Sequence, residues 1–186
     1  MPYEVTEELH YQVPALDVHS IIKLSKHLSL DARAQVQVIQ NLVSVGPRWA
    51  TELTDRTCLS IGDDFGFWFG HVTVEGFKTR GYGFQNYPNA SVGYRFNKRI
   101  LFTFKAEALM NLGITTHAGD IPVTSKSTTF SGSAYTVALE QPFYGKKSIT
   151  LGLRAIYTNF FWQTWSAFTS FDRNFFYPQL IVGIIL

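Results

Sequence analysis

Apolar and polar residues alternate along extended stretches of this chain. Residues 95–112 (RFNKRILFTFKAEALMNL) show the alternation most clearly. One row is apolar and the opposite row is polar: Ile100, Phe102, Phe104, Ala106, Ala108 and Met110 against Thr103, Lys105, Glu107 and Asn111. A period of two residues predicts a β-strand whose two faces meet different surroundings.

The same layout, a basic turn followed by a long alternating strand, recurs in residues 23–39 and 141–160. Extended to the whole chain, the pattern predicts ten strands, near residues 3–13, 16–24, 28–42, 52–61, 65–77, 89–96, 99–112, 131–143, 148–163 and 175–186. Eight strands are the alternative, if the first 27 residues lie outside the sheet.

The predicted connections are of two kinds. Short turns include the Gly-Asp-Asp sequence at 62–64, and longer polar connections are expected at 41–56 (partly strand), 78–89, 113–129 and 166–174. Short turns at one end and long loops at the other are typical of an up-and-down antiparallel meander. No segment has a helical period and no domain boundary is evident, so residues 1–186 are expected to form one all-β domain.

Alternation does not say which face meets water. A soluble barrel turns its apolar row inward, whereas a transmembrane barrel turns it toward lipid and keeps the polar row in the lumen. Small residues in the polar row favour a crowded interior: Gly93, Ala138, Gly152 and Gly183. Strands of ten or more residues suit a tilted crossing of the membrane, and aromatic residues gather near both strand ends. We therefore predict a closed transmembrane barrel, because lipid does not tolerate an open sheet edge.

The chain resembles the small bacterial outer-membrane β-barrel proteins, and is most similar in style to those of Bacteroidota. The resemblance lies in the segments SVGYRFNKRILF (91–102) and NFFYPQLIVGIIL (174–186) and covers roughly residues 16–186, by pattern and not by a specific motif. It implies an outer-membrane location, with short periplasmic turns and long outer loops. One departure is Leu186, which stands where the family usually ends on an aromatic residue read during insertion.

Composition narrows the class further. Hydrophobic residues make up 46% of the chain, charged residues 16% and aromatic residues 16%. The net charge of +2 gives no reason to expect nucleic acid, and the single Cys58 excludes an internal disulfide. The acidic start MPYEVTEELHYQVP lacks the apolar core of a secretory signal, so we expect a mature chain that begins with an added Met.

Charged residues in the polar rows are expected to point into the lumen: Asp31, Arg33, Arg95, Lys105, Glu107, Glu140 and Arg154. Glu107, Glu140 and Arg154 fall on three consecutive predicted strands, so we expect them to meet. Buried charges persist only when they are paired, and arginine can bond two carboxylates at once. A polar plug that fills a narrow barrel is the favoured interpretation, and an ion or proton path is the alternative.

Other polar residues give weaker signals. His71 and Glu75 are four residues apart on one predicted strand, but no recognisable nucleophile accompanies them. His117 and Asp120 lie in a predicted loop, Asp63 and Asp64 in a predicted turn, and Asn89 in an Asn-Ala-Ser sequence that matches a glycosylation acceptor. We predict no catalytic site, no metal site and no cofactor.

Aromatic residues of the long connections give the stronger functional hint. Seven are expected as lipid anchors or partner contacts: Trp49, Trp162, Trp165, Phe168, Phe171, Phe175 and Phe176. The sequence thus predicts a non-enzymatic outer-membrane barrel with a closed lumen, an accessory or structural subunit that presents outer loops to a larger assembly or a surface ligand. A narrow channel is the first alternative and a lipid-acting enzyme is the second.

Overall fold

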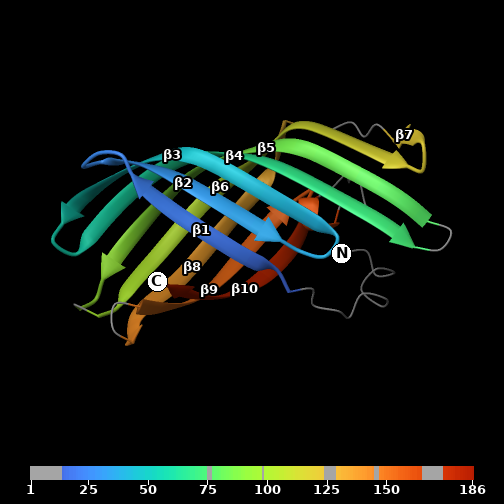
Figure 1. The fold of residues 1–186 in the computed structure, drawn as a ribbon. Helices are drawn as coiled ribbons and strands as arrows, with labels where there is room; N and C mark the ends of the chain where they lie inside the picture. Colours follow the sequence, from blue (N-terminus) through green and yellow to red (C-terminus); the bar gives the residue numbers. More distant parts are fainter. Residues whose placement is uncertain (1–13, 75–76, 98, 124–128, 145–146, 165–173) are drawn as a thin grey trace.

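The fold is all-β. The computed structural model describes residues 14–74, 77–97, 99–123, 129–144, 147–164 and 174–186, so the strand predicted at 3–13 lies outside the described residues. Within them, ten antiparallel strands form one meandering sheet that curls into an open half-barrel (Figure 1). No helix in these ranges is long and apolar enough to cross a membrane.

The sheet follows the order of the chain, with the short strand β7 paired to the end of β6. The strands are β1 (Leu16–Lys23), β2 (Leu28–Val36), β3 (Gln40–Thr54), β4 (Thr57–Val74), β5 (Phe77–Arg95), β6 (Leu101–Ala118), β7 (Ile121–Val123), β8 (Phe130–Tyr144), β9 (Lys147–Thr158) and β10 (Phe175–Ile185). A short 3-10 turn, η1 (Trp162–Thr164), follows β9. All neighbouring strands in the described sheet run antiparallel, which confirms the predicted meander.

Several predicted boundaries are wrong. Residues 28–42 form parts of two strands, because the chain turns at 37–39 between β2 and β3. The Gly-Asp-Asp sequence is no turn: Gly62 and Asp64 lie inside β4, paired with Asn89 and Tyr87 of β5. Residues 78–89, expected as a loop, belong to β5. Short connections occur at both ends of the sheet, at 24–27 and at 37–39, and are not confined to one end as predicted.

These errors have one physical cause. Glycine, asparagine and aspartate usually mark turns. Here they fill inward positions of central strands, where small side chains give room and polar ones meet other polar groups. Tyr87, for example, packs so closely over Gly66 that a Cβ there would lie 2.9 Å from its ring.

The two faces of the sheet differ as the alternation predicts. On β6, Phe104 is 41% exposed on the convex face, whereas Glu107, in the opposite row of the same strand, is 7% exposed on the concave face. The convex face presents large exposed apolar side chains on every long strand, including Val45 on β3, Phe67 on β4 and Leu180 on β10. The polar rows face the interior of the half-barrel.

One end of the concave face is filled by the connection after β9. Phe160 and Trp162 are buried against Leu42 of β3 and Trp68 of β4, and Trp68 is fully buried. Gln163 accepts hydrogen bonds from Gln40 of β3 (2.6 Å) and Gln179 of β10 (2.9 Å). This segment therefore joins strands that are far apart in the sheet.

A close approach of two backbones occurs where β3 passes β4. A Cβ on Gly46 would lie 2.1 Å from the carbonyl oxygen of Asp63, so glycine is required there. The next residue is Pro47, which has no N–H to give to the ladder. The pairing of β3 with β4 is accordingly interrupted between Val45 and Arg48, while the register stays the same on both sides.

We predict that Gly46→Ala lowers the free energy of unfolding by about 1–3 kcal/mol, the usual cost of overpacking, because the added methyl collides with backbone that cannot move aside. Gly113→Ala on β6 is the matched control, since no atom lies within 4 Å of its added Cβ. Urea titration of both variants gives the comparison. Equal stability of the two variants would show that β3 and β4 are further apart than described.

Candidate functional site

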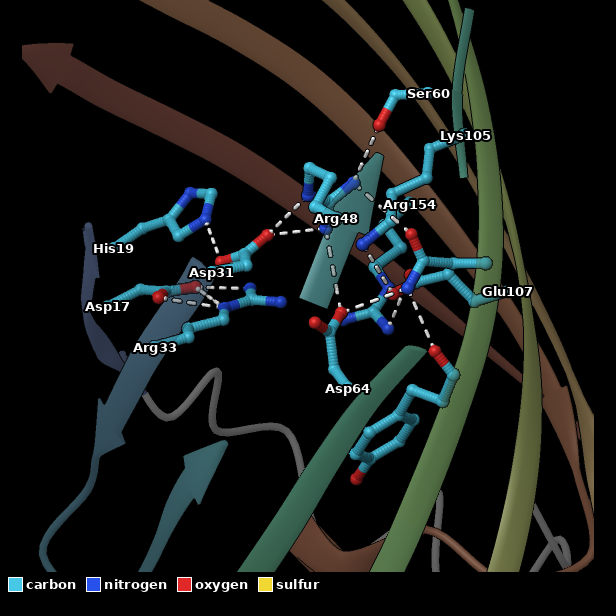
Figure 2. Close-up of polar contacts among 12 residues, drawn as sticks. Asp17, His19, Asp31, Arg33, Arg48, Ser60, Asp64, Lys105, Glu107 and Arg154 are labelled. Carbon is cyan, nitrogen blue, oxygen red and sulfur yellow. Dashed lines mark hydrogen bonds and ion pairs between the residues drawn. The ribbon is translucent and has the colours of Figure 1, made fainter. Parts of the chain in front are cut away.

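A network of charged side chains occupies the middle of the concave face (Figure 2). It starts at the edge strand β1, where Asp17 accepts hydrogen bonds from Nε of Arg33 on β2, both at 2.9 Å. His19, also on β1, contacts Asp31 of β2. Both pairs follow from the register, because His19 lies opposite Arg33 and Asp17 lies opposite Gln35.

Arg48 of β3 links the first part of the network to the next strands. Its Nε donates to Asp31 at 2.8 Å, and its Nη2 lies 3.6 Å from a carboxylate oxygen of Asp64 on β4. Asn89 of β5 completes the group, donating to Asp64 at 2.9 Å and accepting from Arg48 at 3.3 Å. Gly46 lies beside Asp31 in the register and leaves the space that these side chains use.

Glu107 is the centre of the second part of the network. It is 7% exposed and accepts from Lys105 at 2.8 Å on its own strand, β6. Its other oxygen lies 2.8 Å from Nη2 of Arg154 on β9. Strand β8 separates the two, and Arg154 can reach across it because Ala134 stands opposite Glu107.

The predicted lumen residues are only partly brought together. Asp31, Arg33, Lys105, Glu107 and Arg154 have the ion pairs described above. Glu140 lies opposite Thr150, four positions along β9 from Arg154, which is about 13 Å at the rise of a strand. Arg95 is exposed at the end of β5, at the same end of the sheet as Glu140, because both lie opposite Leu101 of β6. Neither of these side chains has an ion pair within the part of the chain that the structure describes.

Sequence reasoning missed Asp17, His19, Arg48 and Asp64. Arg48 falls in a predicted connection and Asp64 in a predicted turn, so the sequence analysis does not predict on which face of the sheet their side chains lie. A signal was present in β3: Val43, Val45, Pro47 and Trp49 alternate with Ser44, Gly46 and Arg48. Gly46 and Pro47 are typical of turns and therefore concealed strand β3, although the alternation supports it. Gly62 concealed part of β4 in the same way.

The arrangement of these side chains favours mutual neutralisation of buried charges over a catalytic role. Four carboxylates, on Asp17, Asp31, Asp64 and Glu107, are paired with four cations, on Arg33, Arg48, Lys105 and Arg154. The space between them is about 70 Å³. A cavity needs roughly 10–15 Å³ for one water, so this one has room for about five. The formal charges of these four carboxylates and four cations therefore balance.

The other candidate residues lie apart from this network. His71 hydrogen-bonds to Thr73 at 2.9 Å, and Glu75 lies outside the described residues. Asp63 accepts from Asn86 at 2.6 Å, and Asn89 is buried inside the sheet, where no glycan could attach. His117 is the last residue but one of β6, and Asp120 lies in the turn before β7. Across the described ranges, no group of three or more His, Cys, Asp or Glu side chains could hold a metal ion.

The aromatic residues expected at an exposed rim divide into three groups. Trp162 and Phe175 are buried at 4% and 7% exposure, so the prediction that they contact lipid or a partner is wrong. Trp162 is buried because it packs in one cluster with Phe160, Leu42 and Trp68. Trp49 and Phe176 are exposed on the convex face, and Trp165, Phe168 and Phe171 lie outside the described residues.

We predict strong coupling between Arg154 and Glu107. Arg154→Met alone should cost about 3–5 kcal/mol of unfolding free energy, because it removes one partner of a buried pair. The double variant with Glu107→Gln should cost less than the sum of the two single changes, by about 0.5–3 kcal/mol.

Glu140→Gln is the matched control for this cycle. Because Glu140 lies far along the strand from Arg154, its effect should add to that of Arg154→Met within about 0.5 kcal/mol. Unfolding in urea supplies all the values. Coupling of Arg154 to Glu140 in place of Glu107 would mean that β8 and β9 pair in a different register.

The comparisons with known proteins leave the geometry as the basis for any functional conclusion. No protein-family model matches this sequence, and no curated protein matches it.

Proposed function

We propose that this protein is a closed transmembrane β-barrel of the bacterial outer membrane, with a structural or accessory role and no enzymatic activity. The observation that carries the proposal is the sorting of side chains in the half-barrel: exposed apolar groups on the convex face and paired charges on the concave face. A soluble barrel has the opposite arrangement, and lipid is the solvent that suits this one.

The height of the apolar surface fits a bilayer. On β4 the outward row runs from Leu59 to Phe69 and includes Ile61, Phe65 and Phe67, which are 37–52% exposed. Ten residue steps at about 3.4 Å make roughly 34 Å along the strand, or about 24–28 Å after a tilt of 35–45°. The apolar band of outer-membrane barrels is about 25 Å tall.

The apolar row ends abruptly at one side. The outward row after Phe69 and Tyr82 consists of His71, Arg80 and His117, which face each other across β4, β5 and β6. A change from aromatic to basic residues marks a membrane–water interface. Within the band, Asp63 is an exception on the convex face, and its hydrogen bond to Asn86 reduces the cost of placing it there.

Strands β4, β5 and β6 continue past this boundary. They have 18, 19 and 18 residues, whereas a tilted crossing needs about 9–11. Their continuation, with β7, projects beyond the shorter strands (Figure 1). A sheet that extends beyond the bilayer supports the proposed accessory role, because it offers a rigid surface to a partner outside the membrane.

The concave face supports a closed lumen over the two alternative functions. Its carboxylates are paired with cations, and the segment containing Phe160 and Trp162 fills one end. A channel needs a continuous wet path, and a hydrolase or acyltransferase needs an activated nucleophile beside a base. Neither arrangement is seen in the part of the chain that is described.

Leu153→Arg tests the membrane location. Leu153 is 60% exposed on the convex face of β9, so in water an arginine there should change stability by less than about 0.5 kcal/mol. In lipid the change should cost about 2–4 kcal/mol near the midplane. Tyr144→Arg at the end of β8 is the depth control, with an expected cost of about 0–1 kcal/mol near the interface. Wild-type protein that is monodisperse without detergent, with a neutral Leu153→Arg, would contradict the proposal.

The closed lumen predicts that protein reconstituted in a planar bilayer gives no steady conductance. The physical reason is that paired charges and aromatic side chains fill the interior. Reproducible ion-selective steps would show that the protein is a channel, provided that Glu107→Gln changes the selectivity. Arg95→Gln, at the exposed end of β5, is the control and should leave the selectivity unchanged.

A further inference from the structure

Four basic residues gather on the convex face, just beyond the aromatic end of the apolar row. His71 of β4, Arg80 of β5 and His117 of β6 lie side by side, because Arg80 is opposite His71 on one side and His117 on the other. Lys78 occupies the next outward position of β5, opposite Thr73. The side chains of His71, Lys78 and Arg80 are exposed, and that of His117 is half-buried. We call these four residues the basic patch.

The basic patch has no counter-charge of its own. Side chains directly opposite each other on neighbouring strands have Cβ atoms about 4.5–5.5 Å apart, so basic groups there repel one another whenever the imidazoles are protonated. Among the residues that the structure describes, every ion pair lies on the concave face. Neither the basic patch nor Asp120, in the turn that follows β6, takes part in one. An anion from outside the chain would relieve this repulsion.

The depth of the basic patch is that of lipid headgroups. Tyr82 is the last aromatic residue of the outward row of β5, and Arg80 lies two residues beyond it. Two residues at a rise of about 3.4 Å advance about 5–6 Å along the membrane normal after a tilt of 35–45°. The headgroup layer on each side of the hydrocarbon is roughly 5–7 Å thick. Lys78 lies further out, and its flexible stem lets the ammonium group reach back into this layer.

We propose that the basic patch binds the phosphate of an anionic lipid headgroup, with the acyl chains lying along the exposed aromatic side chains of the same row. The inference rests on the membrane location proposed above. Arginine suits this role because its planar guanidinium can bond two phosphate oxygens at once, and an imidazole on either side can donate an N–H. Tyr82 and Phe84, which are 44% and 54% exposed, continue the outward row from Arg80 and offer the apolar surface that the chains need.

The surroundings of the basic patch favour a lipid over an acidic protein. The exposed rings of Phe69 and Tyr82 adjoin it, so a soluble partner would have to enter the headgroup layer to reach Arg80. At the opposite end of the sheet, the outward rows of β4, β5 and β6 end on Thr57, Tyr94 and Phe102, which carry no charge. The site therefore belongs to one leaflet, at the end from which β4, β5 and β6 project (Figure 1).

Titration of the detergent-solubilised full chain with dioleoyl phosphatidic acid tests the proposal, with bound lipid counted by native mass spectrometry. Wild-type protein should retain this lipid in preference to dioleoyl phosphatidylcholine, which has the same acyl chains and no net charge. Arg80→Gln should weaken the apparent affinity for phosphatidic acid by roughly ten- to a hundredfold, the equivalent of one hydrogen bond to a charged group. Arg80→Lys should recover part of this loss, because it keeps the charge without the planar fork.

Lys147→Gln is the matched control, because Lys147 is exposed at the opposite end of the sheet, at the start of β9. It should bind phosphatidic acid as the wild type does, and all variants should keep the wild-type urea midpoint without lipid, since the substituted side chains are exposed.

Equal affinity for the two lipids, or an unchanged affinity in Arg80→Gln, would overturn the proposal. Displacement of phosphatidic acid by an equal concentration of inorganic phosphate would overturn it in favour of a site for small anions. The membrane location is judged separately by Leu153→Arg. A chain that needs lipid for its stability and retains both lipids equally would lose the headgroup site and keep the membrane location.

Discussion

Arg48 is the contact on which the interior of the half-barrel depends. Its guanidinium lies between Asp31 of β2 and Asp64 of β4 and reaches Asn89 of β5, so one side chain connects four strands. Away from water, an unpaired carboxylate costs several kcal/mol, and the planar fork of arginine can serve more than one. The glycine at Gly46 and the break in the ladder at Pro47 are the local conditions that give it space. Elsewhere on the concave face, arginine again pairs with a buried or partly buried carboxylate: Arg33 with Asp17 and Arg154 with Glu107.

Much of the fold could be predicted from alternation, and the reasons for the misses are specific. Strands β6, β8 and β9 were located because their apolar rows are uninterrupted. Strands β3, β4 and β5 were misjudged because Gly46, Pro47, Gly62 and Asn89 are residues that usually favour turns. Gly46, Gly62 and Asn89 in fact belong to the inward row of a half-barrel with a polar concave face, and Pro47 lies on the exposed convex face.

The site was predictable only in its residue types. Sequence places Glu107 and Arg154 on the same face, but it does not give the stagger between β6, β8 and β9. That stagger puts Arg154 near Glu107 and leaves Glu140 about four residues away along the strand. The burial of Trp162 was also beyond the reach of sequence, because it depends on a tertiary contact with Leu42 and Trp68 that no periodicity signals.

The segment after β9 has a consequence for how the chain folds. Most neighbours in the sheet are joined by short connections and can pair early, whereas residues 159–174 separate β9 from β10. Gln163 differs, because its bond to Gln40 spans 123 residues and its bond to Gln179 needs the last strand. Contacts of such long range are formed late, since the entropy of closing the loop opposes them until the sheet exists. The interior would thus stay hydrated and adaptable through most of assembly, and the aromatic groups of this segment would expel water from one end only as the final strand is added.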